Sequence, residues 1–72
     1  MNQTEFDQAL AGSGMPDVGV IMAYEEGSLD EEQIIQMVQH GINHGWIWSL
    51  PGHYGRLASD LIKNGSCARS AT

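Results

Sequence analysis

The clearest hydrophobic pattern in the chain lies between residues 28 and 45. Its apolar positions recur at helical spacing and form one stripe, which predicts an amphipathic helix. The stripe consists of Ile34, Ile35, Val38 and Ile42. The preceding sequence SLDEE indicates a capping box, with Ser28 at the N-cap and Glu31 at the third helical position. We expect the helix to end at Gly45, since glycine readily adopts the left-handed conformation that closes helices.

A second amphipathic pattern covers residues 52–65. Apolar residues recur there at i, i+3, i+4, i+7 and i+8, as they do on one face of a helix. They are Tyr54, Leu57, Ala58, Leu61 and Ile62. We expect this helix to begin near Gly52 or His53 and to end at Asn64 and Gly65.

Between these two helices, the sequence WIWSLP favours a short extended connector. Alternate side chains of an extended chain point to opposite sides. Both tryptophans would then face one way together with Leu50, and Ile47 would face the other. Pro51 strengthens this prediction, because proline biases the residue before it toward an extended conformation.

Two less regular helices are predicted near the N-terminus. Thr4 can cap a short helix over residues 5–11, which the sequence GSG ends. Asp17 can cap a two-turn helix that ends at Gly27. Gly19 and the valines beside it also suit a strand, which stays open as an alternative for this segment.

Together these patterns predict an all-α protein, a small helical bundle of three to four short helices with a Trp-rich extended connector. We expect residues 1–16 to form an N-terminal extension with a short helix, residues 17–65 a helical domain, and residues 66–72 a flexible tail. The 72-residue chain has one cysteine, Cys67, so an internal disulfide is excluded. Small chains need some other stabilisation, and we expect a homo-oligomer rather than a structural metal.

Charge divides the chain into two unequal parts. Residues 1–50 hold eight acidic residues and no Lys or Arg, whereas residues 51–72 hold three basic residues and one acidic residue. With a net charge of −6, the chain is not expected to bind nucleic acid directly. It has no signal-peptide pattern and no apolar run near the roughly 20 residues of a membrane span. We therefore expect a cytoplasmic protein without membrane contact.

The stretch WIWSLPGHYGR, residues 46–56, is the first candidate binding site. Its rings could stack a flat ligand, and its glycines and first basic side chain could hold an anion at a helix start. The candidate ligand-binding residues are Trp46, Trp48, Gly52, His53, Tyr54, Gly55 and Arg56. The alternative is that the rings fill the core and that Arg56 pairs with a glutamate.

The acidic residues around the predicted turn form the second candidate site, which would bind a basic partner protein. They are Glu25, Glu26, Asp30, Glu31 and Glu32. Helix capping and solvation explain the same residues without a partner. His40 and His44, at i, i+4 on one helix, are weak candidates for a metal site, and the helix dipole also favours histidines there. We expect no cofactor, and no motif indicates an enzyme.

The motifs of residues 24–65 resemble a widespread family of short phage and prophage proteins of unknown function. Members share an E-x-G-x-L-x-E-E start and a W-x-L-x-G-x-Y-G-R-x-A-x-x-L-I-x-x-G segment. The matching positions are Glu25, Gly27, Leu29, Glu31, Glu32, Gly45, Trp48, Leu50, Gly52, Tyr54, Gly55, Arg56, Ala58, Leu61, Ile62 and Gly65. Pro51 stands where the family usually has Gln. The resemblance implies a phage protein that acts in the cytoplasm of an infected bacterium.

These observations predict a small non-enzymatic binding protein of phage type. Its expected role is counter-defence or host takeover, by occupying or sequestering a host component. That component would be either a host defence protein with a basic surface or a nucleotide signal. The alternative function is that of a structural or regulatory oligomeric accessory protein without a small-molecule ligand.

Overall fold

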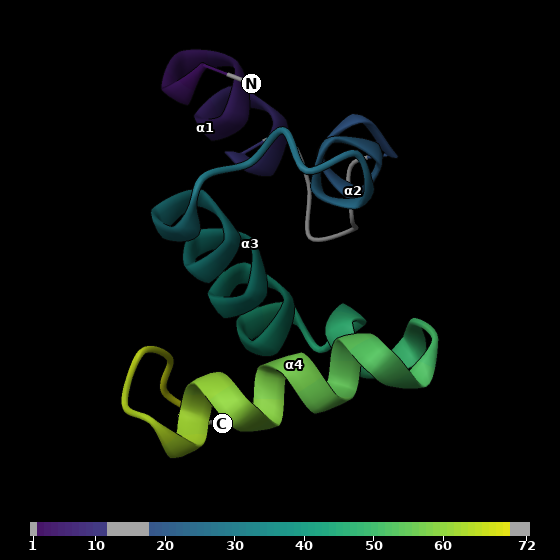
Figure 1. Cartoon of the computed structure of the whole chain (residues 1–72), viewed down its shortest axis with the longest axis vertical. Coiled ribbons are helices and arrows are strands. Elements are labelled where there is room, and N and C mark those ends of the chain that lie inside the picture. The colour runs from purple at the N-terminus through teal and green to yellow at the C-terminus, as the bar shows by residue number, and fades with distance from the viewer. Residues whose placement is uncertain (1, 12–17, 70–72) are drawn as a thin grey trace.

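The computed structural model describes residues 2–11 and 18–69, and these form a helical domain. The elements are α1 (Gln3–Ala11), α2 (Val18–Glu25), α3 (Glu31–His44), the 3-10 helix η1 (Trp46–Ser49) and α4 (Gly52–Lys63). The predicted all-α class is confirmed. Figure 1 shows α1 and α2 together at one end of α3, while α4 crosses the other end. No helix in the described ranges is long and apolar enough to cross a membrane.

The N-terminal cap of α3 lies two residues later than the predicted one. Asp30 is the N-cap, and its Oδ1 accepts a hydrogen bond from the Gln33 backbone at 2.8 Å. The Gln33 Oε1 in turn accepts a hydrogen bond from the Asp30 backbone at 3.2 Å. Ser28 does not start α3, because its backbone N–H donates to the Ala23 carbonyl at 2.8 Å and closes α2.

The predicted glycine stops are confirmed. Gly27, Gly45 and Gly65 all have positive φ angles of about 80°, the left-handed conformation expected after a helix. The start of α1 differs from the prediction, because the Asn2 side chain accepts a hydrogen bond from the Glu5 backbone at 2.8 Å. Thr4 therefore lies inside α1. The other predicted cap, Asp17, lies outside the described residues.

The core draws residues from every helix and from both predicted appendages. Phe6 of α1 is fully buried, so the described part of the predicted N-terminal extension packs into the domain. Cys67 follows α4 and is also buried, so the predicted flexible tail is packed at its start. The buried apolar residues are Phe6, Val20, Ala23, Leu29, Met37, Val38, Ile42, Trp46, Ile47, Tyr54, Ala58 and Cys67.

The predicted extended connector is wrong: WIWS forms the 3-10 helix η1, and only Leu50 after it is extended. Trp46 and Ile47 are buried, whereas Trp48 is exposed. Gly41 of α3 permits this turn, since a Cβ there would stand 2.9 Å from the Ile47 Cβ. The absence of a side chain lets η1 pack directly on α3, and the two tryptophans that the extended prediction placed on one side lie in different environments.

Candidate functional site

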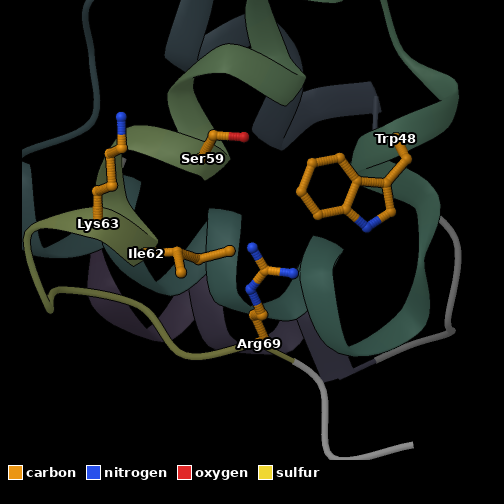
Figure 2. A pocket seen from close by; sticks show the side chains of 5 residues that line it. All are labelled: Trp48, Ser59, Ile62, Lys63 and Arg69. Carbon is orange, nitrogen blue, oxygen red and sulfur yellow. The ribbon is translucent and has the colours of Figure 1, made fainter.

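A pocket of about 320 Å³ opens where η1, α4 and the segment after α4 meet. Figure 2 shows the Trp48 indole on one side of it and Lys63 on the other, with the Arg69 guanidinium pointing between Ile62 and the indole. The lining residues are Trp48, Ser59, Ile62, Lys63 and Arg69. The pocket thus combines a flat aromatic wall, two cations and a hydroxyl group.

Helix α4 supplies three of the lining residues and supports the Trp48 ring. Ser59, Ile62 and Lys63 stand at i, i+3 and i+4, so they share one face of this helix. Gly55, one turn earlier, faces the Trp48 ring, whose Cε3 would lie at an ordinary contact distance of 3.7 Å from a Cβ at that position. The indole can therefore rest against the helix while 52% of the residue stays exposed.

The segment after α4 brings Arg69 to the pocket. Two hydrogen bonds join the Gln39 side chain to the Ala68 backbone: Gln39 Nε2 donates to the carbonyl at 2.9 Å, and Gln39 Oε1 accepts from the N–H at 2.8 Å. Beside them the Cys67 thiol donates to the Ile35 carbonyl at 3.6 Å. Burial raises the pKa of the Cys67 thiol, which keeps it neutral and unreactive in this structural role.

The charge of the pocket is opposite to that of the chain. Lys63 and Arg69 are two of the three basic residues in a protein of net charge −6. Both are exposed, and neither forms an ion pair within residues 2–11 and 18–69. Two unpaired cations beside an exposed indole suit a ligand that carries an anionic group and a flat ring.

Tyr54 connects α4 to α2. Its hydroxyl donates to Glu25 Oε1 at 2.9 Å, and its ring lies 5.6 Å from the Tyr24 ring, centroid to centroid. Burial, together with the Glu25 carboxylate that accepts its hydrogen bond, raises the pKa of Tyr54 to about 12. The hydroxyl is therefore a fixed hydrogen-bond donor at neutral pH and not an acid–base group.

His40 and His44 are stacked on α3, with ring centroids 4.3 Å apart. The Trp46 Nε1 donates to His40 Nδ1 at 3.1 Å, so this ring nitrogen serves as a hydrogen-bond acceptor within the fold. Burial, and then the charge of His44, lower the pKa of His40, whereas a hydrogen bond with the Leu10 backbone opposes them. Within the described residues, no three His, Cys, Asp or Glu side chains gather as a metal site requires.

The model of a domain of unknown function, DUF7417, matches residues 12–72. The chain belongs to this family. The matched region contains the whole pocket and the segment that carries Arg69, and it begins after α1. No curated protein and no solved structure matched the chain.

Of the seven candidate ligand-binding residues in this DUF7417 chain, Trp48 lines the pocket. Trp46 and Tyr54 fill the core, as the alternative interpretation held. The others stand on α4 outside the pocket lining: Gly52, His53, Gly55 and Arg56. The Arg56 side chain is exposed and has no hydrogen bond or ion pair with a glutamate or any other described residue.

Four pocket residues are absent from the set predicted by sequence. Ser59, Ile62 and Lys63 carried a usable signal, because their spacing places them on one helix face. Arg69 carried none, since its position depends on the packing of the preceding segment against α3.

The five acidic candidate residues are all exposed, but two of them have structural partners. Asp30 caps α3, and Glu25 accepts the hydrogen bond from Tyr54. The carboxylates of Glu26, Glu31 and Glu32 make no hydrogen bond or ion pair in the part of the chain that the structure describes. Capping therefore accounts for part of this cluster, and three carboxylates are left facing solvent.

Proposed function

We propose that this protein is a non-enzymatic binding protein that captures a small ligand with a flat ring and a phosphate group, a nucleotide in chemical class. The observation that carries the proposal is the pocket between Trp48 and the two cations Lys63 and Arg69. In a chain of net charge −6, this pocket offers an anion two positive charges that form no ion pair among the described residues.

The dimensions and chemistry of the pocket support this ligand class. Its volume of about 320 Å³ falls at the lower end of small-molecule sites, which favours a compact ligand such as a mononucleotide. A base stacked on an aromatic ring gains roughly 1–3 kcal/mol. The Arg69 guanidinium can bind phosphate oxygens in a bidentate manner, with Lys63 as a second charge and Ser59 as a hydroxyl donor.

The resemblance to phage proteins suggests what such binding would accomplish. A phage protein that holds a nucleotide signal in the cytoplasm of its bacterial host would lower the free concentration of that signal, which amounts to counter-defence by sequestration. A homo-oligomer would carry several copies of the pocket. The alternative function, an oligomeric accessory protein without a ligand, makes no use of the unpaired cations.

Isothermal titration calorimetry with a panel of defined compounds tests the proposal. The panel contains AMP, ADP, a cyclic dinucleotide, adenosine and inorganic phosphate. We expect a phosphorylated nucleoside to bind more tightly than adenosine or phosphate alone, because it engages both the indole and the cations. If none of the five binds or raises the melting temperature, the proposal is overturned.

Two arginine variants form a matched pair for this test. Arg69→Gln should weaken nucleotide binding about tenfold or more, the cost of losing a charge-assisted hydrogen bond. Arg56→Gln removes an exposed arginine outside the pocket lining and should leave the affinity unchanged. The opposite result would move the site to the N-terminus of α4. Light scattering on the same samples reports the oligomeric state, and a stable oligomer without any ligand would favour the accessory role.

A further inference from the structure

The helix α2 is apolar on its outer side as well as on its inner side. Val20 and Ala23 are buried against the core, as expected of the inner face. Val18 and Met22, one turn apart, lie on the opposite side and are 71% and 55% exposed. A helix that is apolar all round is ordinarily buried all round, so the outer side of α2 lacks, among residues 2–11 and 18–69, the cover that its sequence suits.

We propose that this outer face, Val18 and Met22 with half-buried Ile21 at its edge, is a docking surface for a basic amphipathic helix of another protein. The inference goes beyond the nucleotide pocket and does not depend on it. A partner helix would lay its own apolar stripe along the two exposed side chains, and methionine adapts well to such contacts.

Charge complementarity identifies the partner as basic. Glu26, which follows α2 directly, is exposed, and its carboxylate makes no hydrogen bond or ion pair within the described residues. Residues 1–55 contain no Lys or Arg, so no positive charge of α1, α2 or α3 opposes an approaching cation. Cations on the flanks of a partner helix would therefore meet carboxylates alone around this face.

The same charges disfavour a second copy of this chain as the occupant. A two-fold symmetric dimer through α2 would bring the same surface from both copies together. The carboxylates of Glu25 and Glu26 from both copies would then lie in one interface with no Lys or Arg of α1, α2 or α3 to offset them, and like charges at an interface cost affinity. Self-association predicted for this protein would need a different surface.

Fluorescence anisotropy with two labelled peptides tests the docking surface. One peptide forms an amphipathic helix with leucines on one face and lysines beside them, and the other carries glutamates in place of the lysines. We expect the intact protein to bind the lysine peptide, with an affinity that falls as salt increases, and not to bind the glutamate peptide. Equal binding of both peptides, or of neither, overturns the proposal.

Variants locate the binding on the protein. Met22→Gln and, separately, Val18→Gln should each weaken binding of the lysine peptide about tenfold, because each removes apolar area from the contact. Trp48→Gln is the matched control, since it alters an exposed apolar residue outside α2 and should leave peptide binding unchanged. Glu26→Gln should reduce the salt dependence.

These measurements distinguish a failure of the nucleotide proposal from a failure of the docking proposal. Met22→Gln should keep nucleotide binding, whereas Trp48→Gln should lose it and keep the peptide. A concentration-dependent dimer that Met22→Gln dissolves would show that a second copy occupies the face, and it would overturn the assignment of a basic partner. Circular dichroism confirms that each variant remains folded.

Discussion

The two tryptophans of η1 stand two residues apart and lie in opposite environments. Trp46 is 6% exposed and belongs to a dense junction with α3, where its indole donates a hydrogen bond to His40. Trp48 is 52% exposed and forms a wall of the open pocket beside α4. One ring closes the core, and the other ring is available to a ligand.

The helical turn of η1 accounts for this separation. In a strand, residues two apart point to the same side, so both rings would share one environment. In a 3-10 helix with three residues per turn, they point about 120° apart. The 3-10 conformation of η1 therefore places one tryptophan ring in the core and leaves the other at the surface. Four predictions test the contrast between the α3–η1 junction and the pocket.

The largest effect is expected from Trp46→Ala. Truncating this buried ring removes packing against α3 and leaves the His40 acceptor without its donor, which should lower the free energy of unfolding by about 3–5 kcal/mol. Urea denaturation followed by circular dichroism measures the loss. A loss below about 1 kcal/mol would contradict a tightly packed junction between Trp46 and α3.

Two glycine variants should shift stability in opposite directions. Gly41→Ala places a Cβ 2.9 Å from the Ile47 Cβ, and this overpacking should cost about 1–3 kcal/mol, partly offset by the better helix propensity of alanine.

Gly55→Ala is its counterpart on the pocket side. Its Cβ would meet the Trp48 ring at an ordinary 3.7 Å, so propensity dominates and should stabilise the protein by up to about 1 kcal/mol. Thermal unfolding measures both variants. If both variants shift the melting temperature in the same direction, the close approach of η1 to α3 does not explain why residue 41 is a glycine.

Mild acid should weaken the junction through His40. Because the pKa of His40 is lowered in the folded state, the folded protein binds fewer protons than the unfolded chain near and below the ordinary pKa of histidine, about 6.5. The contribution of His40 to the free energy of unfolding is therefore complete above that pH. It declines as the pH falls toward the lower pKa that His40 has in the folded state. The Nδ1 that accepts the Trp46 hydrogen bond also loses this role on protonation.

The measurement compares the melting temperature of the wild type and of His40→Gln between pH 7.5 and pH 5. The wild type should lose more stability than the variant over this range, and the difference isolates His40. If the melting temperatures of the two proteins fall in parallel as the pH is lowered, His40 makes no pH-dependent contribution to stability.

Trp48→Ala should have the smallest effect on stability. The ring is half exposed, so its removal should change the free energy of unfolding by about 1 kcal/mol or less. The same variant should abolish nucleotide binding at concentrations that saturate the wild type. A stability loss as large as that of Trp46→Ala would assign the ring to the core and remove the pocket wall.

Local signals predicted most of the helices. The amphipathic stripes of α3 and α4 appear in the sequence because one face of each helix must be apolar to pack. The cap of α3 was predicted two residues early because Ser28 and Asp30 are equally suitable capping residues by type. In the structure, the reciprocal hydrogen bonds between Asp30 and Gln33 identify Asp30 as the cap, while the Ser28 backbone N–H bonds to the Ala23 carbonyl of α2.

The sequence by itself determined where three of the helical segments end and that the chain cannot form an internal disulfide. Glycine occupies the left-handed conformation at Gly27, Gly45 and Gly65 because other residues adopt it at a cost, so these stops are local properties. An internal disulfide is excluded by composition alone, because the chain has a single cysteine.

The tertiary structure alone decided the conformation of WIWS and the composition of the pocket. The 3-10 turn depends on room that Gly41 leaves on a different helix. The place of Arg69 beside Trp48 depends on Gln39 and Cys67, which hold the chain after α4 against α3. Contacts between residues far apart in the chain leave no periodic signal, so the pocket arises only where the assembled helices meet.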